Sequence, residues 1–291
     1  MLEIEIAKIK MKNPLMLASG ILDLTRESME SFSHAGAIVT KSVGREERKG
    51  YKNPSIYELP YGLLNAIGLA NPGIDEYIKE IDGIKVDVLI GSIFGENGEE
   101  FGYVARKMAP YVKAIEMNMS CPHAKKLGAE YPTDEIKEAV EEVKKSGKPT
   151  FVKLGMENLM ERALQAVDAK ADAIVAINTV RAMAIDIDAR MPVLANKIGG
   201  YSGMAIKPIG VRCVYELASE YDLPIIGVGG ITNAEDAIEY MMAGATAVQI
   251  GTGIYYEGKE IFQKILHDMD EWLDENGYNS IKDIIGIALK R

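Results

Sequence analysis

The stretch PIIGVGGITNAEDAIEYMMAGATAVQIGTG, residues 224–253, decides the fold. Pro224–Val228 and Ala247–Thr252 are short apolar runs rich in β-branched residues, as expected of strands buried on both faces. Between them, Thr232-Asn233-Ala234-Glu235 has a capping-box pattern that predicts a helix from Asp236 to Ala243, and Gly244 follows directly. The stretch therefore predicts two parallel strands joined by a crossover helix.

The same alternation of apolar runs and amphipathic segments recurs along the chain. One such segment runs from Thr133, a predicted N-cap, through Lys145, with Gly147 as the predicted stop. The predicted strands are Leu15–Ala18, Ala37–Ser42, Val86–Ile93, Ala114–Met119, Thr150–Leu154, Ala173–Thr179, Pro224–Val228 and Ala247–Thr252. Because eight parallel strands close a barrel, the predicted fold is an α/β TIM (β/α)8 barrel, with residues 1–291 as a single domain.

Two segments exceed a minimal barrel. The alternating pattern of Leu2–Met11 predicts an N-terminal β-hairpin across the bottom of the barrel. The connection Val43–Lys85, inserted after the second strand, contains several prolines and glycines. Loops of this length inside a compact domain are usually functional, so we expect it to contribute to a site.

Charge and composition exclude several classes of function. The formal net charge of −10 disfavours binding to nucleic acid or to an anionic membrane. The N-terminus lacks the basic residues of a signal peptide, and no apolar run is long enough to span a bilayer, so we expect a cytoplasmic protein. His34, His123 and His267 have no metal-ligand spacing, and we predict no metal site.

The ends of the predicted strands carry polar side chains. In β/α barrels the working residues lie at the carboxyl ends of the strands. Lys41 and Lys153 adjoin buried strands, where an ammonium needs a partner, and are candidates for a site that binds an anion. Asn118 and the pair Asn178-Thr179 end two further strands. The amines and amides should therefore lie together at the carboxyl-terminal end of the barrel.

Glycines follow the last two strands, in Gly227-Val228-Gly229-Gly230 and Gly251-Thr252-Gly253. Backbone N–H groups in such loops can approach an anion closely. Each loop taken alone is equally consistent with a tight turn. Their place after strands seven and eight, where barrels commonly bind phosphate, favours a phosphate site.

The cysteines are Cys121 and Cys213. Most free cysteines are small buried hydrophobes, and Cys213, on the predicted helical face Val211–Leu217, fits that description. Cys121 instead follows a strand end and precedes Pro122, beside Asn118, in a loop that could cover a pocket. Two cysteines cannot supply the four thiolates of a usual iron–sulfur cluster.

Four motifs together resemble one enzyme family. They are Asn65-Ala66-Ile67-Gly68-Leu69, Asn118-Met119-Ser120-Cys121-Pro122, Ala195-Asn196 through Gly199-Gly200-Tyr201-Ser202-Gly203, and Gly227-Val228-Gly229-Gly230-Ile231. In this combination and order they resemble the dihydroorotate dehydrogenases of class 1 along nearly the whole chain. The longer run from Asn65 to Gly73 resembles class 1B, the NAD-linked heteromeric type, more than the fumarate-linked class 1A.

The resemblance implies oxidation of (S)-dihydroorotate to orotate in pyrimidine (UMP) synthesis, with FMN as cofactor. Cys121 would remove the C5 proton while a hydride passes from C6 to FMN, and the loop Pro122–Thr133 would close over the substrate. The implied FMN-binding residues are Ser19, Lys41, Ser42, Asn118, Lys153, Ile177, Gly203, Gly229, Gly230, Gly251 and Thr252. The implied substrate-binding residues are Lys41, Asn65, Ala66, Ile67, Gly68, Leu69, Asn118, Asn178 and Thr179.

The resemblance to class 1B also implies a partner. Electrons would pass to NAD through a second subunit that carries FAD and a [2Fe-2S] cluster, with a homodimer of this chain at the core of a heterotetramer. The sequence agrees, because it has too few cysteines for a cluster and no strand-linked G-x-G-x-x-G fingerprint of a dinucleotide-binding domain.

Two positions depart from the family pattern, and several alternatives stay open. Ser92 stands where the family usually offers the flavin an asparagine, and Pro132 replaces a glycine in the covering loop. The alternatives are a class 1A enzyme, an FMN barrel that acts on another pyrimidine such as uracil or thymine, a flavin-free phosphate-binding isomerase or lyase, and a non-catalytic binding module.

Overall fold

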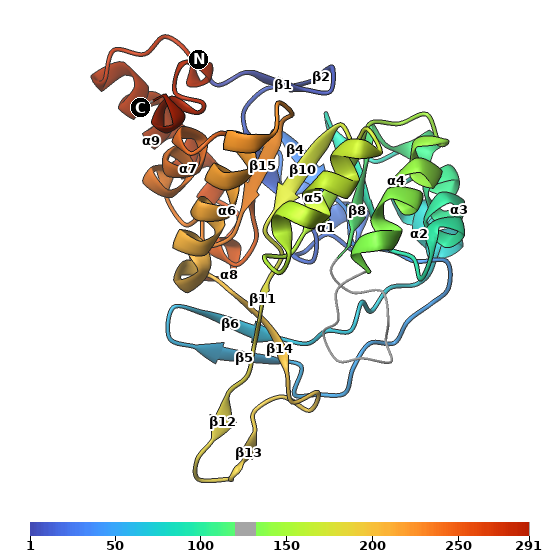
Figure 1. Cartoon of the computed structure of the whole chain (residues 1–291). Coiled ribbons are helices and arrows are strands. Elements are labelled where there is room, and N and C mark those ends of the chain that lie inside the picture. The colour runs from blue at the N-terminus through green and yellow to red at the C-terminus, as the bar shows by residue number, and fades with distance from the viewer. Residues whose placement is uncertain (120–131, 291) are drawn as a thin grey trace.

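A closed barrel of parallel strands forms the centre of the computed structural model, which describes residues 1–119 and 132–290 (Figure 1). In order around the ring, the strands are β10 (Ala173–Ala176), β15 (Ile225–Val228), β16 (Ala245–Ile250), β3 (Leu15–Leu17), β4 (Ala37–Val39), β7 (Leu89–Ile93), β8 (Ala114–Asn118) and β9 (Thr150–Leu154). Pairing of β16 with β3 closes the ring. The predicted TIM barrel is confirmed, and each strand overlaps a predicted run.

Several strands end earlier than predicted. The ladder of β4 stops at Val39 and that of β10 at Ala176, so that Lys41, Ser42, Asn178 and Thr179 lie in the loops beyond. Side chains in these loops are free of the in-and-out alternation of a strand. They can therefore turn toward the barrel axis.

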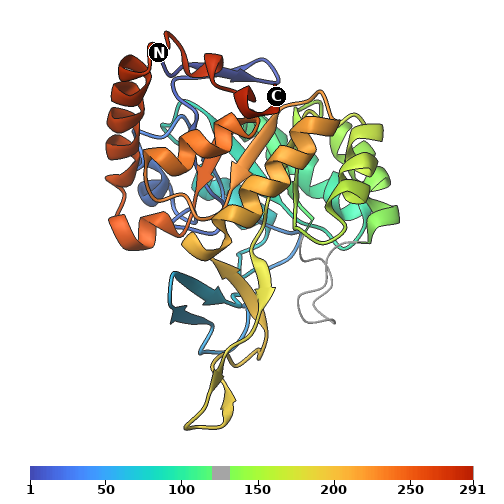
Figure 2. The same cartoon turned by 60° about the vertical axis from the view of Figure 1, so that its left-hand side comes forward.

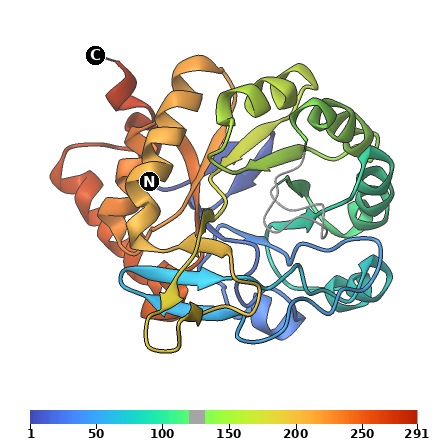
Figure 3. The same cartoon turned by 60° about the horizontal axis from the view of Figure 1, so that its bottom comes forward.

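Helices surround the barrel in a ring (Figure 3). Helix α3 shows why they pack there, because Phe101, Val104, Ala105 and Met108 recur at helical spacing and are fully buried. The helices are α1 (Arg26–Glu30), α2 (Ile74–Ile81), α3 (Gly98–Met108), α4 (Ile136–Lys144), α5 (Leu159–Asp168), α6 (Lys207–Glu220), α7 (Ala234–Met242), α8 (Gly253–Glu257) and α9 (Ile261–Glu275). Short 3-10 turns are η1 (Ala109–Tyr111), η2 (Thr133–Glu135), η3 (Met204–Ile206), η4 (Ile281–Asp283) and η5 (Ile287–Leu289).

Both predicted helix starts need correction. The N-cap of α7 is Asn233, whose side-chain oxygen accepts a hydrogen bond from the Asp236 N–H at 2.8 Å, so the helix begins two residues before Asp236. The Thr232 hydroxyl instead donates to the Asp236 carboxylate at 2.8 Å. Thr133 does not cap α4, because it is the first residue of η2, which precedes α4.

The predicted N-terminal hairpin is confirmed. Strands β1 (Ile4–Ile6) and β2 (Ile9–Met11) pair antiparallel, with Ile4, Ile6 and Met11 buried. Figure 1 shows the hairpin at the end of the barrel opposite the outer sheet described next.

A four-stranded outer sheet lies at the carboxyl ends of the barrel strands (Figures 1 and 2). Its order is β11 (Val180–Ala182), β14 (Gly199–Ser202), β6 (Gly62–Asn65) and β5 (Ile56–Leu59). The last two strands come from the predicted insertion after β4, and the first two come from a second insertion after β10 that the sequence reading did not recognise. The hairpin of β12 (Ile185–Asp186) and β13 (Met191–Pro192) projects beyond the sheet.

Within residues 1–119 and 132–290, no helix combines the length and the apolar character needed to cross a membrane.

The outer sheet has its own small apolar cluster of Leu64, Ala66 and Leu194. Leu64 is fully buried, and truncating a buried leucine to alanine costs about 2–5 kcal/mol. We expect Leu64→Ala to loosen the outer sheet while the barrel stays folded, because the barrel core is a separate cluster. The measurement is the rate of limited proteolysis within residues 180–202, compared with Ile185→Ala at an exposed position. Equal rates for the two variants would contradict this role of the cluster.

Candidate active site

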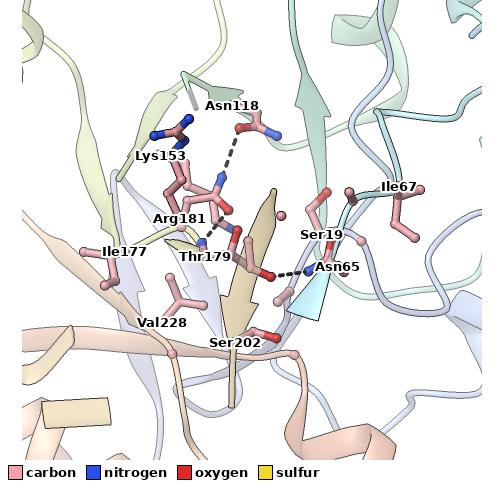
Figure 4. A pocket seen from close by; sticks show the side chains of 18 of the residues that line it. Ser19, Asn65, Ile67, Asn118, Lys153, Ile177, Thr179, Arg181, Ser202 and Val228 are labelled. Atoms are coloured by element: carbon pink, nitrogen blue, oxygen red, sulfur yellow. Dashed lines mark hydrogen bonds between the residues drawn. The ribbon is translucent and has the colours of Figure 1, made fainter. Parts of the chain in front are cut away.

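A cavity of about 920 Å³ lies between the carboxyl ends of the barrel strands and the outer sheet (Figure 4). Apart from Cys121, every residue predicted to bind cofactor or substrate lines it. These are Ser19, Lys41, Ser42, Asn65, Ala66, Ile67, Gly68, Leu69, Asn118, Lys153, Ile177, Asn178, Thr179, Gly203, Gly229, Gly230, Gly251 and Thr252. Cys121 lies outside the described residues, as do His123 and most of the predicted covering loop.

The glycine loops after β15 and β16 face this cavity together. Gly229 and Gly230 have φ values of 128° and 74°, which other residues rarely adopt. Among the described residues, the N–H groups of Gly229, Gly230, Gly251 and Thr252 donate no hydrogen bond within the chain. N–H groups without internal acceptors at one cavity suit an anion, and the phosphate site stays a prediction.

A chain of side-chain hydrogen bonds fixes the amides at the mouth. The Asn178 amide donates to Asn118 Oδ1 at 3.2 Å, and the Asn118 amide donates to Ser42 Oγ at 3.1 Å. Ser42 Oγ in turn lies 3.1 Å from Ser19 Oγ. In Figure 4 a dashed line marks the hydrogen bond that Asn118 accepts. Each amide therefore presents a defined edge to the cavity.

Ser92, which departs from the family pattern, lies behind this chain. It is fully buried, and its hydroxyl is 2.8 Å from Ser42 Oγ. Its N–H donates to Thr40 Oγ1 at 2.9 Å, and it is not part of the cavity lining. Ser92 therefore helps to fix the Ser42 hydroxyl by a hydrogen bond, without itself lining the cavity. Pro132, the other departure, does line the cavity.

Below the cavity, a lysine, a carboxylate and an amide form a buried group that the sequence reading missed in part. The Lys153 ammonium donates to Gln249 Oε1 at 2.9 Å and lies 3.5 Å from Glu116 Oε1. Gln249 Nε2 donates to Glu116 Oε2 at 2.5 Å. The sequence signal for Glu116 was a charged residue inside the apolar strand Ala114–Asn118.

Lys41 lies beside the buried carboxyl group of Asp23. Within the described residues the Lys41 ammonium has no hydrogen-bond or ion-pair partner of its own. The Asp23 carboxylate accepts a hydrogen bond from the Gly20 N–H at 2.5 Å, and its backbone carbonyl accepts from Tyr77 Oη at 2.7 Å. Burial raises the pKa of Asp23, and the charge of Lys41 opposes that rise. Burial likewise raises the pKa of Tyr77, which keeps the phenol a donor.

Two arginines at the cavity were also missed. Arg162 of α5 is 2% exposed and donates to the Met119 carbonyl at 2.9 Å, so it anchors the chain where β8 ends. Arg181 of β11 is exposed and lines the cavity from the outer sheet. Neither arginine could be recognised from the sequence, because both belong to segments whose placement depends on the tertiary fold.

The remaining candidates lie away from the cavity. Cys213 is fully buried in α6, and burial raises the pKa of its thiol, in keeping with a packing role. His267, Asp268 and Glu271 cluster on α9, where His267 Nε2 is 3.3 Å from a Glu271 carboxylate oxygen. Exposed acidic clusters of this kind are common without a metal, and the expectation of no metal stays a prediction.

A comparison with known families matches residues 1–273 to the family described as dihydroorotate dehydrogenase. The chain belongs to the dihydroorotate dehydrogenase family. Relatives named dihydroorotate dehydrogenase B (NAD(+)), catalytic subunit, include those of Pyrococcus abyssi, 49% identical over 100% of both chains, and Methanocaldococcus jannaschii, 49% identical over 99% of this chain and 98% of the relative. The protein of Thermoplasma acidophilum, with the same name, is 49% identical over 99% of each chain. The resemblance read from the motifs is confirmed.

The raised pKa of Asp23 predicts how stability depends on pH. A carboxyl group whose folded pKa lies above its ordinary value of 3.8 favours folding below that value, and this contribution is lost as pH rises through the folded pKa. Asp23→Asn keeps an oxygen for the Gly20 N–H without the charge. We expect the free energy of unfolding of Asp23→Asn, relative to that of the parent, to rise with pH. The rise is about 1.4 kcal/mol for each pH unit by which the folded pKa of Asp23 exceeds its ordinary value. Urea unfolding between pH 3 and pH 8 measures this difference.

The exposed Asp188→Asn is the control. A difference for Asp23→Asn that shrinks as pH rises would contradict the assignment.

Proposed function

We propose that this chain oxidises (S)-dihydroorotate to orotate in pyrimidine (UMP) synthesis, with FMN as its cofactor. The observation that carries the proposal is one cavity that combines two glycine loops, the side chains of Lys41 and Lys153, and a set of oriented amides. Membership of a flavin-dependent family supports it.

The residues present suit FMN. The N–H groups of Gly229, Gly230, Gly251 and Thr252, which find no acceptor in residues 1–119 and 132–290, match a phosphate. A Cβ at Gly230 would come within 2.8 Å of the Gly203 carbonyl, so the loop leaves no room for a side chain. We propose that Ser19, Lys41, Ser42, Asn118, Lys153, Ile177 and Gly203 hold the rest of the cofactor. When bound, FMN supplies a two-electron acceptor for the hydride that leaves C6 of dihydroorotate.

The substrate would be held by charge and by paired amides. The Lys41 ammonium, which has no ion-pair partner among the described residues, would meet the carboxylate of dihydroorotate. Asn65, Asn118, Asn178 and Thr179 offer donors and acceptors to a pyrimidine ring, and the Asn65 amide is fixed by donating to the Gly200 carbonyl at 3.2 Å. Ala66, Ile67, Gly68 and Leu69 line the same cavity.

Cys121 is the proposed base that takes the C5 proton. In the sequence it follows Asn118 by three residues and Met119, whose carbonyl Arg162 binds, by two. A thiolate accepts the proton, so the reaction should speed up as pH rises through the pKa of the thiol.

The name of the relatives, catalytic subunit, indicates that a partner subunit exists. We propose that the partner carries FAD and a [2Fe-2S] cluster and passes electrons to NAD, around a homodimer of this chain in a heterotetramer. The chain has only two cysteines, too few for a usual iron–sulfur cluster, which supports a cluster bound by the partner. We also propose that residues 1–291 form a single domain and that the protein is cytoplasmic.

Anaerobic bleaching of the flavin absorbance by dihydroorotate tests the function. The purified chain, loaded with FMN, should bleach and should stay bleached when NAD is added without the partner. Recovery with fumarate would assign it to class 1A, while a bound flavin that dihydroorotate does not bleach would indicate another pyrimidine. A chain that binds no flavin would favour the flavin-free barrel.

Cys121→Ala should bind FMN and orotate normally but lose bleaching by about 10²–10⁴-fold in rate, the usual contribution of a general base. Cys213→Ala is the matched control at the buried packing position. Bleaching at the rate of the parent would remove Cys121 from the mechanism.

Lys41→Ala should weaken orotate binding by about 10- to 100-fold, because a hydrogen bond to a charged group contributes roughly 1.5–3 kcal/mol. Orotate titration of the flavin spectrum measures this affinity. Lys52→Ala is the control, since Lys52 is exposed in the same insertion and does not line the cavity. Unchanged affinity for Lys41→Ala would show that the carboxylate binds elsewhere.

A further inference from the structure

Glu116, Lys153 and Gln249 form a closed group inside the barrel. They belong to β8, β9 and β16, and all three residues are buried: Glu116 is 0%, Lys153 5% and Gln249 1% exposed. Lys153 lines the cavity, whereas Glu116 and Gln249 do not. Lys153 is therefore the member of the group that reaches the cavity.

Gln249 sets the geometry of this group. Its amide oxygen accepts from Lys153 at 2.9 Å while its amide nitrogen donates to Glu116 at 2.5 Å, so neither partner can turn away without breaking a buried hydrogen bond. Glu116 Oε1 forms no hydrogen bond and faces the ammonium at 3.5 Å. The link between carboxylate and ammonium is therefore mainly electrostatic.

Stability of the fold alone does not explain a buried ion pair of this kind. Removing two charges from water costs as much as their attraction returns, so a pair of apolar residues would stabilise a barrel interior at least as well. Lys153, the positive member of the pair, lines the cavity, whereas Glu116, the negative member 3.5 Å from its ammonium, does not. A dipole in a dry site acts strongly on any charge that develops in front of it.

We propose that Glu116 and Gln249 are positioning residues that hold the Lys153 ammonium against the flavin and set its reduction potential. The inference rests on the proposed function, because it needs a bound FMN. The ammonium stabilises the negative charge that the flavin gains on two-electron reduction, and the Glu116 carboxylate offsets part of that effect. The carboxylate thus keeps the reduced cofactor from becoming too stable to pass its electrons on.

The test is the midpoint potential of the FMN-loaded protein, measured anaerobically against redox dyes. Glu116→Gln keeps the shape and removes the charge, so the ammonium acts without compensation. We expect the equilibrium to shift toward reduced flavin by tenfold or more, equivalent to a potential about 30 mV higher for a two-electron couple. Glu116→Asp keeps the charge, and its equilibrium between oxidised and reduced flavin should stay within threefold of that of the parent.

Glu142→Gln is the matched control, because Glu142 of α4 pairs with Lys145, the residue that follows the helix, and does not line the cavity. It should leave the potential unchanged. A potential in Glu116→Gln that equals the parent value overturns the inference, as does an equal shift in Glu142→Gln.

If Glu116→Gln yields no folded protein, the double variant Glu116→Gln with Lys153→Met replaces it, because it buries no lone charge. Removing the whole dipole should lower the potential below that of the parent, and an unchanged potential overturns the inference. Failure of the proposed function is distinguishable, since the parent protein would then bind no FMN or show no bleaching by dihydroorotate.

Discussion

The pairing of β16 with β3 is the interaction on which the rest of the structure depends, because it turns a row of parallel strands into a ring. Closure brings the carboxyl ends of all barrel strands to one rim. Residues as distant as Ser19 and Thr252 then line one cavity, although neither has any local reason to approach the other. The helices and both insertions are arranged around that ring.

Most of the barrel could be predicted from the sequence because buried parallel strands leave a clear apolar pattern. The helix starts were predicted less well, since Thr232 and Asn233 are both good capping residues and only the backbone conformation selects Asn233. The outer sheet was missed as a unit. Its short strands pair across long sequence distances, as Asn65 does with Gly200, and no local pattern records such a pairing.

In the candidate site too, some residues could be predicted from the local sequence and others only from the tertiary fold. Lys41, Asn118, Lys153 and the glycine loops could be identified because they occur at strand ends, where a barrel places its working groups. Glu116 and Gln249 lie within strands, and only the closed ring shows that both reach Lys153. Ser92 shows the reverse case, because the family pattern suggested a cofactor contact and the structure places the side chain behind Ser42.

The division of the outer sheet between two insertions has a consequence for the order of events on the ribosome. Asn65 leaves the tunnel 135 residues before its partner Gly200. At about 5–20 residues per second, β6 waits roughly 7–30 seconds for β14 to appear. During that interval the exposed strand edge has no native partner, and β16 has yet to be made. A nascent chain must therefore be almost fully synthesised before it can retain a ligand.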